Sequence, residues 1–247
     1  MKKLRYITAL LSLLILFNAC QELEEIANVV IASPTTPAKP ALTNSEVISG
    51  LKEALTLGIK NSVNLTSATD GFLGNAAIKL PFPEDAIKMK EKALEWKLDA
   101  QVTKIETTLN RAAEESTKQA LNIFINAITN MSVQDGFAIL NGGNGAATRF
   151  LKEQTTAQLI TAFKPKVSEA IATVKLTDYW NPVMTRYNQA MTLTNGAKIN
   201  PDLTDYVTKK AISGLFLMVE KEEDKIRMDP LARVTDLLSK VFGSIKN

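Results

Sequence analysis

Apolar residues recur every three or four positions through most of the chain after residue 43. This spacing predicts amphipathic helices whose apolar stripes face a common core. Strict two-residue alternation, which is typical of strands, is scarce, and the pattern therefore predicts an all-α fold. The expected stripes comprise Ile48, Leu51, Leu55 and Ile59; Val102, Ile105 and Leu109; Ile123, Phe124, Ala127 and Ile128; Phe137, Ile139 and Leu140; Leu159, Phe163, Val167, Ile171 and Val174; and Val207, Ala211, Leu215 and Met218.

Polar residues indicate where some of these helices begin. Thr43 with Glu46, and Ser132 with Asp135, have the spacing of a capping box. In this motif the first side chain accepts from a backbone amide one turn ahead, and the second side chain accepts from the first residue's amide. We therefore expect helices to start directly after Thr43 and Ser132.

Proline and glycine predict breaks and turns. Pro165 predicts a kink or a split in its helix, and Asp70-Gly71 and Asn195-Gly196 predict interhelical turns. Asp229-Pro230 predicts the N-cap and first residue of a last helix. That helix would carry Leu231, Val234, Leu238 and Val241 on one face.

The first twenty residues have the pattern of a bacterial export signal. Lys2, Lys3 and Arg5 precede the apolar run Ile7–Phe17, which ends at the only cysteine of the chain, Cys20. The run is shorter than the roughly 20 apolar residues that span a bilayer. The residues before Cys20 resemble a lipobox, which implies an acyl chain such as palmitate on that thiol. The alternative is an ordinary secretory signal followed by a coincidental cysteine.

The resulting domain organisation has three parts. Residues 1–19 form a lipoprotein signal peptide, residues 20–43 form a lipidated, proline-rich tether, and residues 44–247 form one bundle-like helical domain. Three prolines within Ser33–Pro40 favour an extended spacer that holds the domain away from the membrane. A domain of this length buries about 70 per cent or more of its unfolded surface and needs no disulfide bond.

Composition excludes several function classes. Residues 1–19 hold three of the 29 basic residues and none of the 26 acidic ones, which leaves 26 of each sign afterwards. We therefore expect no nucleic-acid partner, since such proteins show a clustered basic excess. The chain has no histidine, and lipidation would use its one cysteine. Catalytic triads, zincin-type sites and thiol–imidazole pairs are excluded on this basis, and no metal or cofactor is expected.

Arg111 and Glu114 form the first candidate site. They lie three residues apart and share one face of a predicted helix, next to small alanines that would let another helix approach. In a functional site, Arg111 would bind an anion and Glu114 would accept a proton. The alternative is a structural ion pair that ties two helices together.

A glycine-rich segment, Asn141–Arg149, forms the second candidate site. Its glycines permit left-handed backbone that ends one helix and begins another. Free amides at the second helix start, together with Thr148 and Arg149, would bind a phosphate or carboxylate. The Lys-Ser/Thr ending of a P-loop is missing, which favours a plain interhelical turn.

The third candidate site is the segment Arg227–Asp236. Arg227 and Arg233 would form a ligand-binding cluster, or else Asp229 caps a helix and Arg233 pairs with Asp236. The preceding EKEEDK run, Glu220–Lys225, is typical of a solvated helix end in which Glu223 pairs with Arg227. The larger aromatic residues would line a pocket or pack between helices: Trp96, Tyr179, Trp180 and Tyr206.

Seven segments of the chain carry a family resemblance: Ser45–Gly58, Ile78–Pro83, Leu109–Glu114, Met131–Gly142, Ala146–Phe150, Tyr206–Phe216 and Ile226–Gly243. Together they resemble a bacterial family known as domain-of-unknown-function family 4197. The resemblance implies a mostly helical protein of the Gram-negative envelope and no known activity. Its characteristic positions would be Asn110, Arg111, Glu114, Asp135, Thr148, Arg149, Arg227, Asp229, Arg233 and Asp236.

These patterns predict a membrane-anchored lipoprotein with a non-enzymatic binding module for an envelope protein or a small ligand. Gln21 after Cys20 resembles an outer-membrane sorting signal, and the domain would face the periplasm or the cell surface. One alternative is a carboxylate- or lysine-based hydrolase of envelope polymers, in which Glu114, Asp135 or Asp236 would converge with Arg111 or Arg149. Another is a carrier of apolar ligands, which needs a large cavity between helices.

Overall fold

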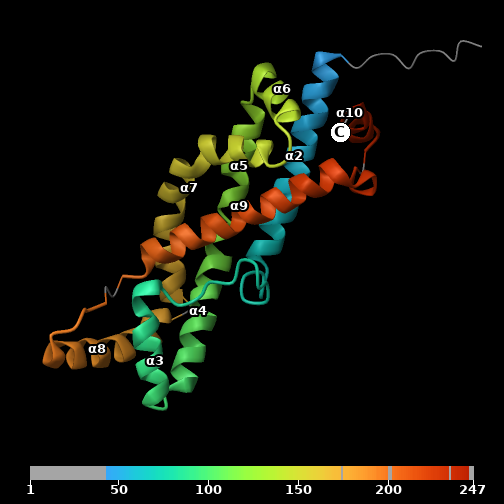
Figure 1. Ribbon diagram of the computed structural model, residues 1–247. Coiled ribbons are helices and arrows are strands. Elements are labelled where there is room, and N and C mark those ends of the chain that lie inside the picture. The colour runs from blue at the N-terminus through green and yellow to red at the C-terminus, as the bar shows by residue number, and fades with distance from the viewer. Residues whose placement is uncertain (1–42, 174, 200–201, 234, 245–247) are drawn as a thin grey trace, which may run out of the picture. The chain divides into compact units, whose positions relative to one another are not determined.

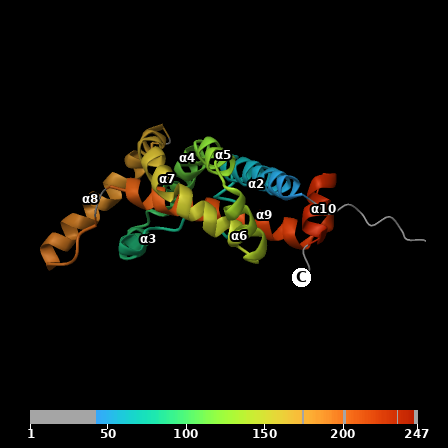
Figure 2. The same cartoon turned by 90° about the horizontal axis from the view of Figure 1, so that it is seen from above.

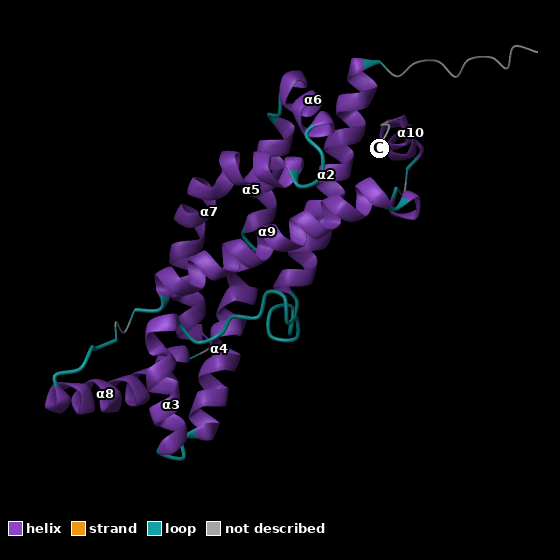
Figure 3. Cartoon of the chain, in the orientation of Figure 1, coloured by secondary structure: helices purple, strands orange, loops and turns teal. Residues whose placement is uncertain are grey.

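The computed structural model describes residues 43–244 except residues 174, 200–201 and 234. The described residues belong to one compact unit, Leu42–Asn247. Every regular element in these ranges is helical (Figure 3), which confirms the all-α prediction. The predicted signal peptide, Cys20 and the tether up to residue 42 lie outside the described residues, as do Val174 and Val234 of the predicted stripes.

The helices follow one another with short connections. In chain order they are α2 (Asn44–Ser67), the 3-10 turn η1 (Glu84–Ala86), α3 (Ile87–Glu95), α4 (Asp99–Thr117), α5 (Ala120–Thr129), α6 (Val133–Asn141), α7 (Ala146–Thr173), α8 (Leu176–Thr194), α9 (Thr204–Met228), the 3-10 turn η2 (Pro230–Ala232) and α10 (Asp236–Ser244). The longest loop, between α2 and η1, passes over α4 and matters for the first candidate site.

Helix α9 is central to the packing. It runs obliquely across the unit and packs against α7, α2 and α4 (Figure 1). Helix α4 also packs against α7 and α8, so α4, α7 and α9 share one core. Helices α8 and α10 lie at opposite ends of the unit in both views (Figures 1 and 2).

The predicted apolar stripes supply the core. Leu51, Leu109, Phe163, Leu215 and other stripe residues are almost completely buried in one continuous cluster. The core is apolar and closely packed, and burial at this scale is the main source of folding free energy. The period of the sequence pattern therefore identified the correct face of most helices.

The predicted helix starts and turns are also present. Both capping boxes form, at Thr43 with Glu46 and at Ser132 with Asp135. Asp70 adopts a left-handed φ of 63°, and a Cβ on the following residue, Gly71, would lie 2.2 Å from the Leu65 carbonyl oxygen. Only glycine fits this turn because the backbone approaches so closely.

Pro165 does not split its helix. Helix α7 continues through Pro165, so that alternative in the prediction is wrong. A proline inside a helix removes one backbone hydrogen bond and crowds the preceding turn. Phe163 and Val167, on either side, are both fully buried, and their packing holds the helix together across the proline.

The last helix begins later than predicted. Asp229 accepts from the amide of Leu231 in the turn η2, and α10 starts only at Asp236, where Thr235 accepts from the amide of Leu238. Leu231 is 89 % exposed, so it does not belong to the buried face. The physical reason is the guanidinium of Arg233, which binds carbonyls at the end of α9 and turns the chain before α10 can form.

Helix length and hydropathy were also compared with the requirements of a membrane span. Among the helices of the described ranges, none is both long enough and apolar enough to cross a bilayer.

Candidate functional site

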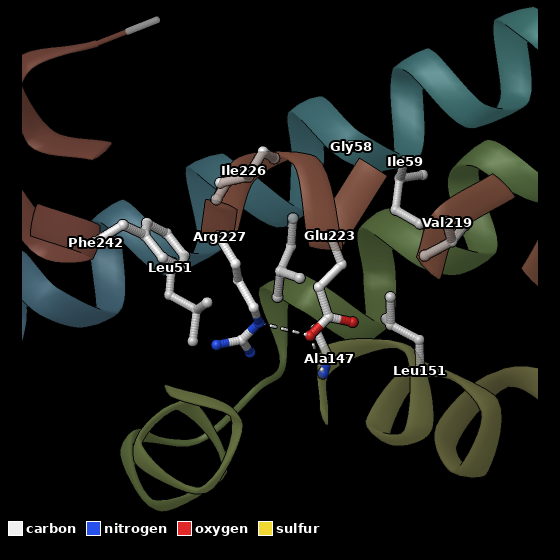
Figure 4. Close-up of a pocket in the computed structure, with 12 residues that line it drawn as sticks. Leu51, Gly58, Ile59, Ala147, Leu151, Val219, Glu223, Ile226, Arg227 and Phe242 are labelled. Atoms are coloured by element: carbon white, nitrogen blue, oxygen red, sulfur yellow. Dashed lines mark hydrogen bonds and ion pairs between the residues drawn. The ribbon is translucent and has the colours of Figure 1, made fainter. Parts of the chain in front are cut away.

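The carboxylate of Glu223 holds the start of helix α7. It accepts a hydrogen bond from the backbone amide of Ala147 at 3.0 Å (Figure 4). It also accepts from the backbone amide of Thr148 at 2.9 Å and from the Thr148 hydroxyl at 2.8 Å. The first amides of a helix have no partner within that helix. Glu223, from the middle of α9, supplies their acceptor, and its negative charge is favourable at a helix N-terminus.

Arg227 completes this arrangement. Its Nε donates to a Glu223 carboxylate oxygen at 3.0 Å, and its Nη2 donates to the Ile139 carbonyl at 2.8 Å. Glu223 is only 8 % exposed. The guanidinium of Arg227, whose side chain is 10 % exposed, neutralises the charge of this buried carboxylate. Through these bonds α9 is joined to the start of α7 and to the end of α6. We call Ala147, Thr148, Glu223 and Arg227 the Glu223 cluster.

The glycine-rich segment is an interhelical turn whose amides are not free. Gly143 and Gly145 have left-handed φ values of 70° and 71°, as their sequence pattern predicted. Arg149 points back into the turn, where its guanidinium donates to the carbonyls of Asn144 and Gly142, each at 3.1 Å. The predicted anion at this helix start is thus a carboxylate of the same chain, and Arg149 closes the turn.

A small cavity lies beside Glu223. It is lined by residues of α2, α7, α9 and α10, including Leu51, Leu55, Leu151 and Phe242 (Figure 4), and its volume is about 20 Å³. That volume holds about one water molecule. An apolar ligand of ordinary size needs several hundred cubic ångströms, so this cavity does not provide the space that a carrier requires.

Glu114 is the centre of a second cluster, on helix α4. Its carboxylate accepts from the amides of Phe72 at 3.1 Å and Leu73 at 3.2 Å, and from Arg111 Nη1 at 2.7 Å. Arg111 also donates to Asp70 at 2.7 Å. The bond to Glu114, followed by the bond to Asp70, raises the pKa of Arg111. We call Asp70, Phe72, Leu73, Arg111 and Glu114 the Glu114 cluster; it fixes the loop after α2 onto α4.

Asn110 holds the same loop further along. Its side-chain oxygen accepts from the Leu80 amide at 2.8 Å, and its Nδ2 donates to the Leu80 carbonyl at 3.1 Å. The side chain thereby pairs with one residue as a neighbouring strand would. Asn110 is fully buried, and these bonds explain why a polar group is tolerated there.

The remaining predicted site residues lie elsewhere and have structural partners. Asp135 is part of the Ser132 capping box, whose hydroxyl and amide hydrogen bonds lower its pKa. Arg233 donates to the carbonyls of Ile226 at 3.0 Å and Arg227 at 2.7 Å. It forms no ion pair with Asp236 in the described ranges, so the predicted Arg233–Asp236 pair is wrong. The carbonyls at the end of α9 attract the cation more strongly because they lie where the helix dipole is negative.

Of the convergence predicted for a hydrolase, the described residues bring together only Glu114 and Arg111, and the Glu114 carboxylate is buried there instead of lining an open cleft. Glu114 is 4 % exposed, and two backbone amides and Arg111 bind its carboxylate. Asp135 caps α6 and Asp236 begins α10, and within the described ranges no ion pair joins an arginine to either of them. No group of three or more acidic or cysteine side chains is placed to hold a metal ion in the part of the chain that the structure describes.

The burial of Glu223 was not predicted from the sequence. The pairing with Arg227 was predicted and is confirmed, but the expectation of a solvated helix end was wrong for this position. The available signal was the spacing of Glu223 from Val219 and Ile226, which are buried on the same helix. Its amide partners are about 75 residues away in the chain, and no local pattern indicates them.

The aromatic residues divide between packing and a surface groove. Trp180 is fully buried against Phe82, and Arg186 lies 4.7 Å over the Trp96 ring. Trp180 and Tyr206 also line a groove between η1, α8 and the start of α9. The two interpretations from the sequence, pocket lining and packing between helices, are therefore each correct in part.

Comparisons with known proteins agree with the resemblance found in the sequence. Residues 41–243 match the family model described as "Protein of unknown function (DUF4197)". Searches of curated proteins and of solved structures gave no significant match. The match covers the described unit nearly from end to end, including both glutamate clusters, and the chain belongs to the DUF4197 family.

Proposed function

We propose that this protein is an envelope lipoprotein, anchored to the outer membrane through an acylated Cys20, whose helical domain is a non-enzymatic binding module. The anchor rests on the sequence of residues 1–20, where a basic segment and a short apolar run end at the only cysteine. The proline-rich tether supplies the distance between membrane and domain.

The proposal of a non-enzymatic role rests on one observation: both buried glutamate carboxylates are already bound by donors of the same chain. Glu114 and Glu223 each accept two backbone amide bonds and one arginine bond. A general base must reach the proton that it removes. These carboxylates are instead held by donors of their own chain, which supports a scaffold that presents surfaces to a partner or a small ligand.

Labelling in cells tests the anchor. Cells that express the wild-type chain or the Cys20→Ser variant would receive an alkyne analogue of palmitate, and the purified chains would be probed for the alkyne. We expect label and membrane association in the wild type and loss of both in the variant. Equal labelling of the two chains, or an unlabelled wild-type chain in the soluble fraction, would contradict the anchor.

Crosslinking in the same cells tests the binding role. A reproducible protein crosslinked to the wild-type domain, or a small ligand that co-purifies with it, is the expected outcome. Hydrolysis of envelope polymers by the purified protein, lost in Glu114→Gln, would instead support the hydrolase. The neighbouring Glu115→Gln variant serves as the control because Glu115 is exposed and pairs only with Lys118.

A further inference from the structure

Helix α10 folds back from the end of α9 and packs mainly against α2 (Figure 1). It has only nine residues, yet its Leu238 and Val241 are almost completely buried. The two helices approach closely at Gly50 of α2, where a Cβ would lie 2.8 Å from Val241 Cγ2 and 3.1 Å from Leu237 Cγ. The surface of α2 is therefore shaped to receive this helix.

The segment between α9 and α10, residues 229–235, forms a hinge that contains the turn η2. Arg233 holds this hinge in its folded-back path. Its guanidinium donates to the carbonyls of Ile226 and Arg227 at the end of α9, and it lies 6.0 Å from the centroid of the Phe242 ring in α10. Arg233 thus connects the two helices and directs α10 toward the α2 of its own chain.

The sequence of the hinge favours a different structure. Asp229-Pro230 has the pattern of an N-cap and a first helical residue, and a helix that began there would carry Leu231, Leu238 and Val241 on one face. In the structure Pro230 begins a 3-10 turn, and α10 begins only at Asp236. Such a conflict between local pattern and tertiary structure is expected at segments that serve a function.

The folded-back path leaves apolar side chains of the hinge uncovered. Met228 is 63 % exposed and Leu231 is 89 % exposed, and they are three residues apart in the chain. Single exposed apolar side chains are common in proteins. These two, however, lie where the direction of α10 is decided, and Leu231 belongs to the apolar face of the longer helix that the sequence favours.

We propose that α10 is exchanged between two copies of this chain, with a helix that begins at Pro230 placing Leu238 and Val241 of one copy on α2 of the other. The contact between α10 and α2 is kept in the exchanged pair, and the straightened hinge buries Leu231 between the copies. Exchange of identical elements is a low-cost route to dimers. The proposal goes beyond the binding role above, and it does not depend on the anchor because it concerns only the helical unit.

Crosslinking between chains tests the exchange directly. Glu46 of α2 lies near Lys240 of α10: hydrogen bonds from Thr43 lower the pKa of Glu46, and the charge of Lys240 lowers it further. Two differently tagged full chains, one with Glu46→Cys and the other with Lys240→Cys, would be co-expressed and treated with a short bismaleimide in mild detergent. A chain with both substitutions identifies the crosslinker length at which this contact reacts, and chains without added cysteines report any background from Cys20.

We expect crosslinked heterodimers of the two singly substituted chains, because the contact between α2 and α10 then joins different copies. In the matched control, Thr194→Cys replaces Lys240→Cys. Thr194 is exposed on α8, at the opposite end of the unit from α10, so this pair should give no heterodimer. Adducts that form only within chains carrying both cysteines would overturn the proposal.

Leu231→Ser separates exchange from folding. Leu231 is largely exposed in the folded-back chain, so the substitution should leave the urea midpoint of the monomer unchanged. The heterodimer yield at limiting protein concentration should fall about tenfold, because the burial of a leucine between the copies is lost. Leu193→Ser is the control, since Leu193 is 88 % exposed at the far end of α8 and should change neither quantity. An unchanged yield for Leu231→Ser would refute the exchanged hinge.

Arg233→Gln should act in the opposite direction. The substitution removes the charged bonds to the end of α9 that hold the folded-back path. We expect the heterodimer yield to rise at least about fivefold. Lys225→Gln, an exposed change near the end of α9, should leave the yield unchanged. A yield for Arg233→Gln that equals or falls below that of the wild type would contradict the proposal.

Discussion

The Glu114 cluster and the Glu223 cluster both stabilise a buried carboxylate with backbone amides and an arginine. In each, a buried glutamate accepts two consecutive backbone amides and one arginine. The amides differ in origin, since those at Glu114 belong to a loop and those at Glu223 begin the 28-residue helix α7. The Glu223 carboxylate therefore also interacts with a helix dipole, and it has a fourth donor in the Thr148 hydroxyl.

The two arginines differ in how easily they could return to water. The Arg111 side chain is 28 % exposed and has a second acidic partner, Asp70. The Arg227 side chain is 10 % exposed, and its second partner is a backbone carbonyl. An arginine without its glutamate is tolerated better at the first site because water and Asp70 can compensate. The comparison teaches that burial of the cation, more than the number of bonds, sets the cost of breaking such a cluster.

The largest expected effect is that of Glu223→Gln. The substitution keeps the shape, removes the charge opposite Arg227 and places an amide donor among existing donors. We expect the free energy of unfolding to fall by about 3–5 kcal/mol, the usual cost of removing one partner of a buried ion pair. Urea unfolding followed by circular dichroism measures this. Glu222→Gln is the control, since Glu222 makes a solvent-accessible bond to Asn61.

Glu114→Gln should be the second largest. The same change at α4 loses charge-assisted bonds to two loop amides, but Arg111 retains Asp70. We expect a loss of about 2 kcal/mol in the same urea experiment. A loss equal to or greater than that of Glu223→Gln would break the comparison, because burial of the arginine would then not be the deciding factor.

Thr148→Val isolates the fourth donor at Glu223. Valine has nearly the shape of threonine, and Thr148 is buried, so the change removes mainly the 2.8 Å hydroxyl bond. A loss of about 1 kcal/mol is expected, and Thr148→Ser should retain most of the stability. If Thr148→Ser were as damaging as Thr148→Val, the methyl group rather than the hydrogen bond would be responsible.

The smallest effect is expected for Asp70→Asn. Asp70 is largely exposed, and asparagine tolerates its left-handed backbone, so only a surface ion pair with Arg111 is lost. We expect a change of about 0.5 kcal/mol or less, diminished further by added salt. A loss comparable with that of Glu114→Gln would mean that Asp70, rather than Glu114, is the principal partner of Arg111.

The features that the sequence predicted correctly are local in the chain. The capping boxes and the Arg111–Glu114 and Glu223–Arg227 pairs each join residues three or four positions apart, and their helical spacing is visible in the sequence. The apolar period identified the buried faces for the same reason. Local geometry is encoded by neighbours, so it can be inferred without the tertiary structure.

The features that were missed depend on distant partners. The amides that bind Glu223 lie on α7, and the loop amides that bind Glu114 lie 41 and 42 residues before it. The start of α10 was misplaced because Arg233 prefers carbonyls of α9 to a helical neighbour. Pro165 was tolerated because its neighbours pack into the core. In each case tertiary contacts override a local preference.

The central claim is that Glu223 caps helix α7 from a different helix, and amide hydrogen exchange tests it most directly. Ala147 and Thr148 lie in the first turn of α7, where no intrahelical carbonyl can protect their amides. We predict slow exchange of both amides in the wild type. In Glu223→Gln they should exchange at least about tenfold faster, beyond any change at Phe72 and Leu73. Equal exchange of Ala147 and Thr148 in the two proteins would contradict the claim.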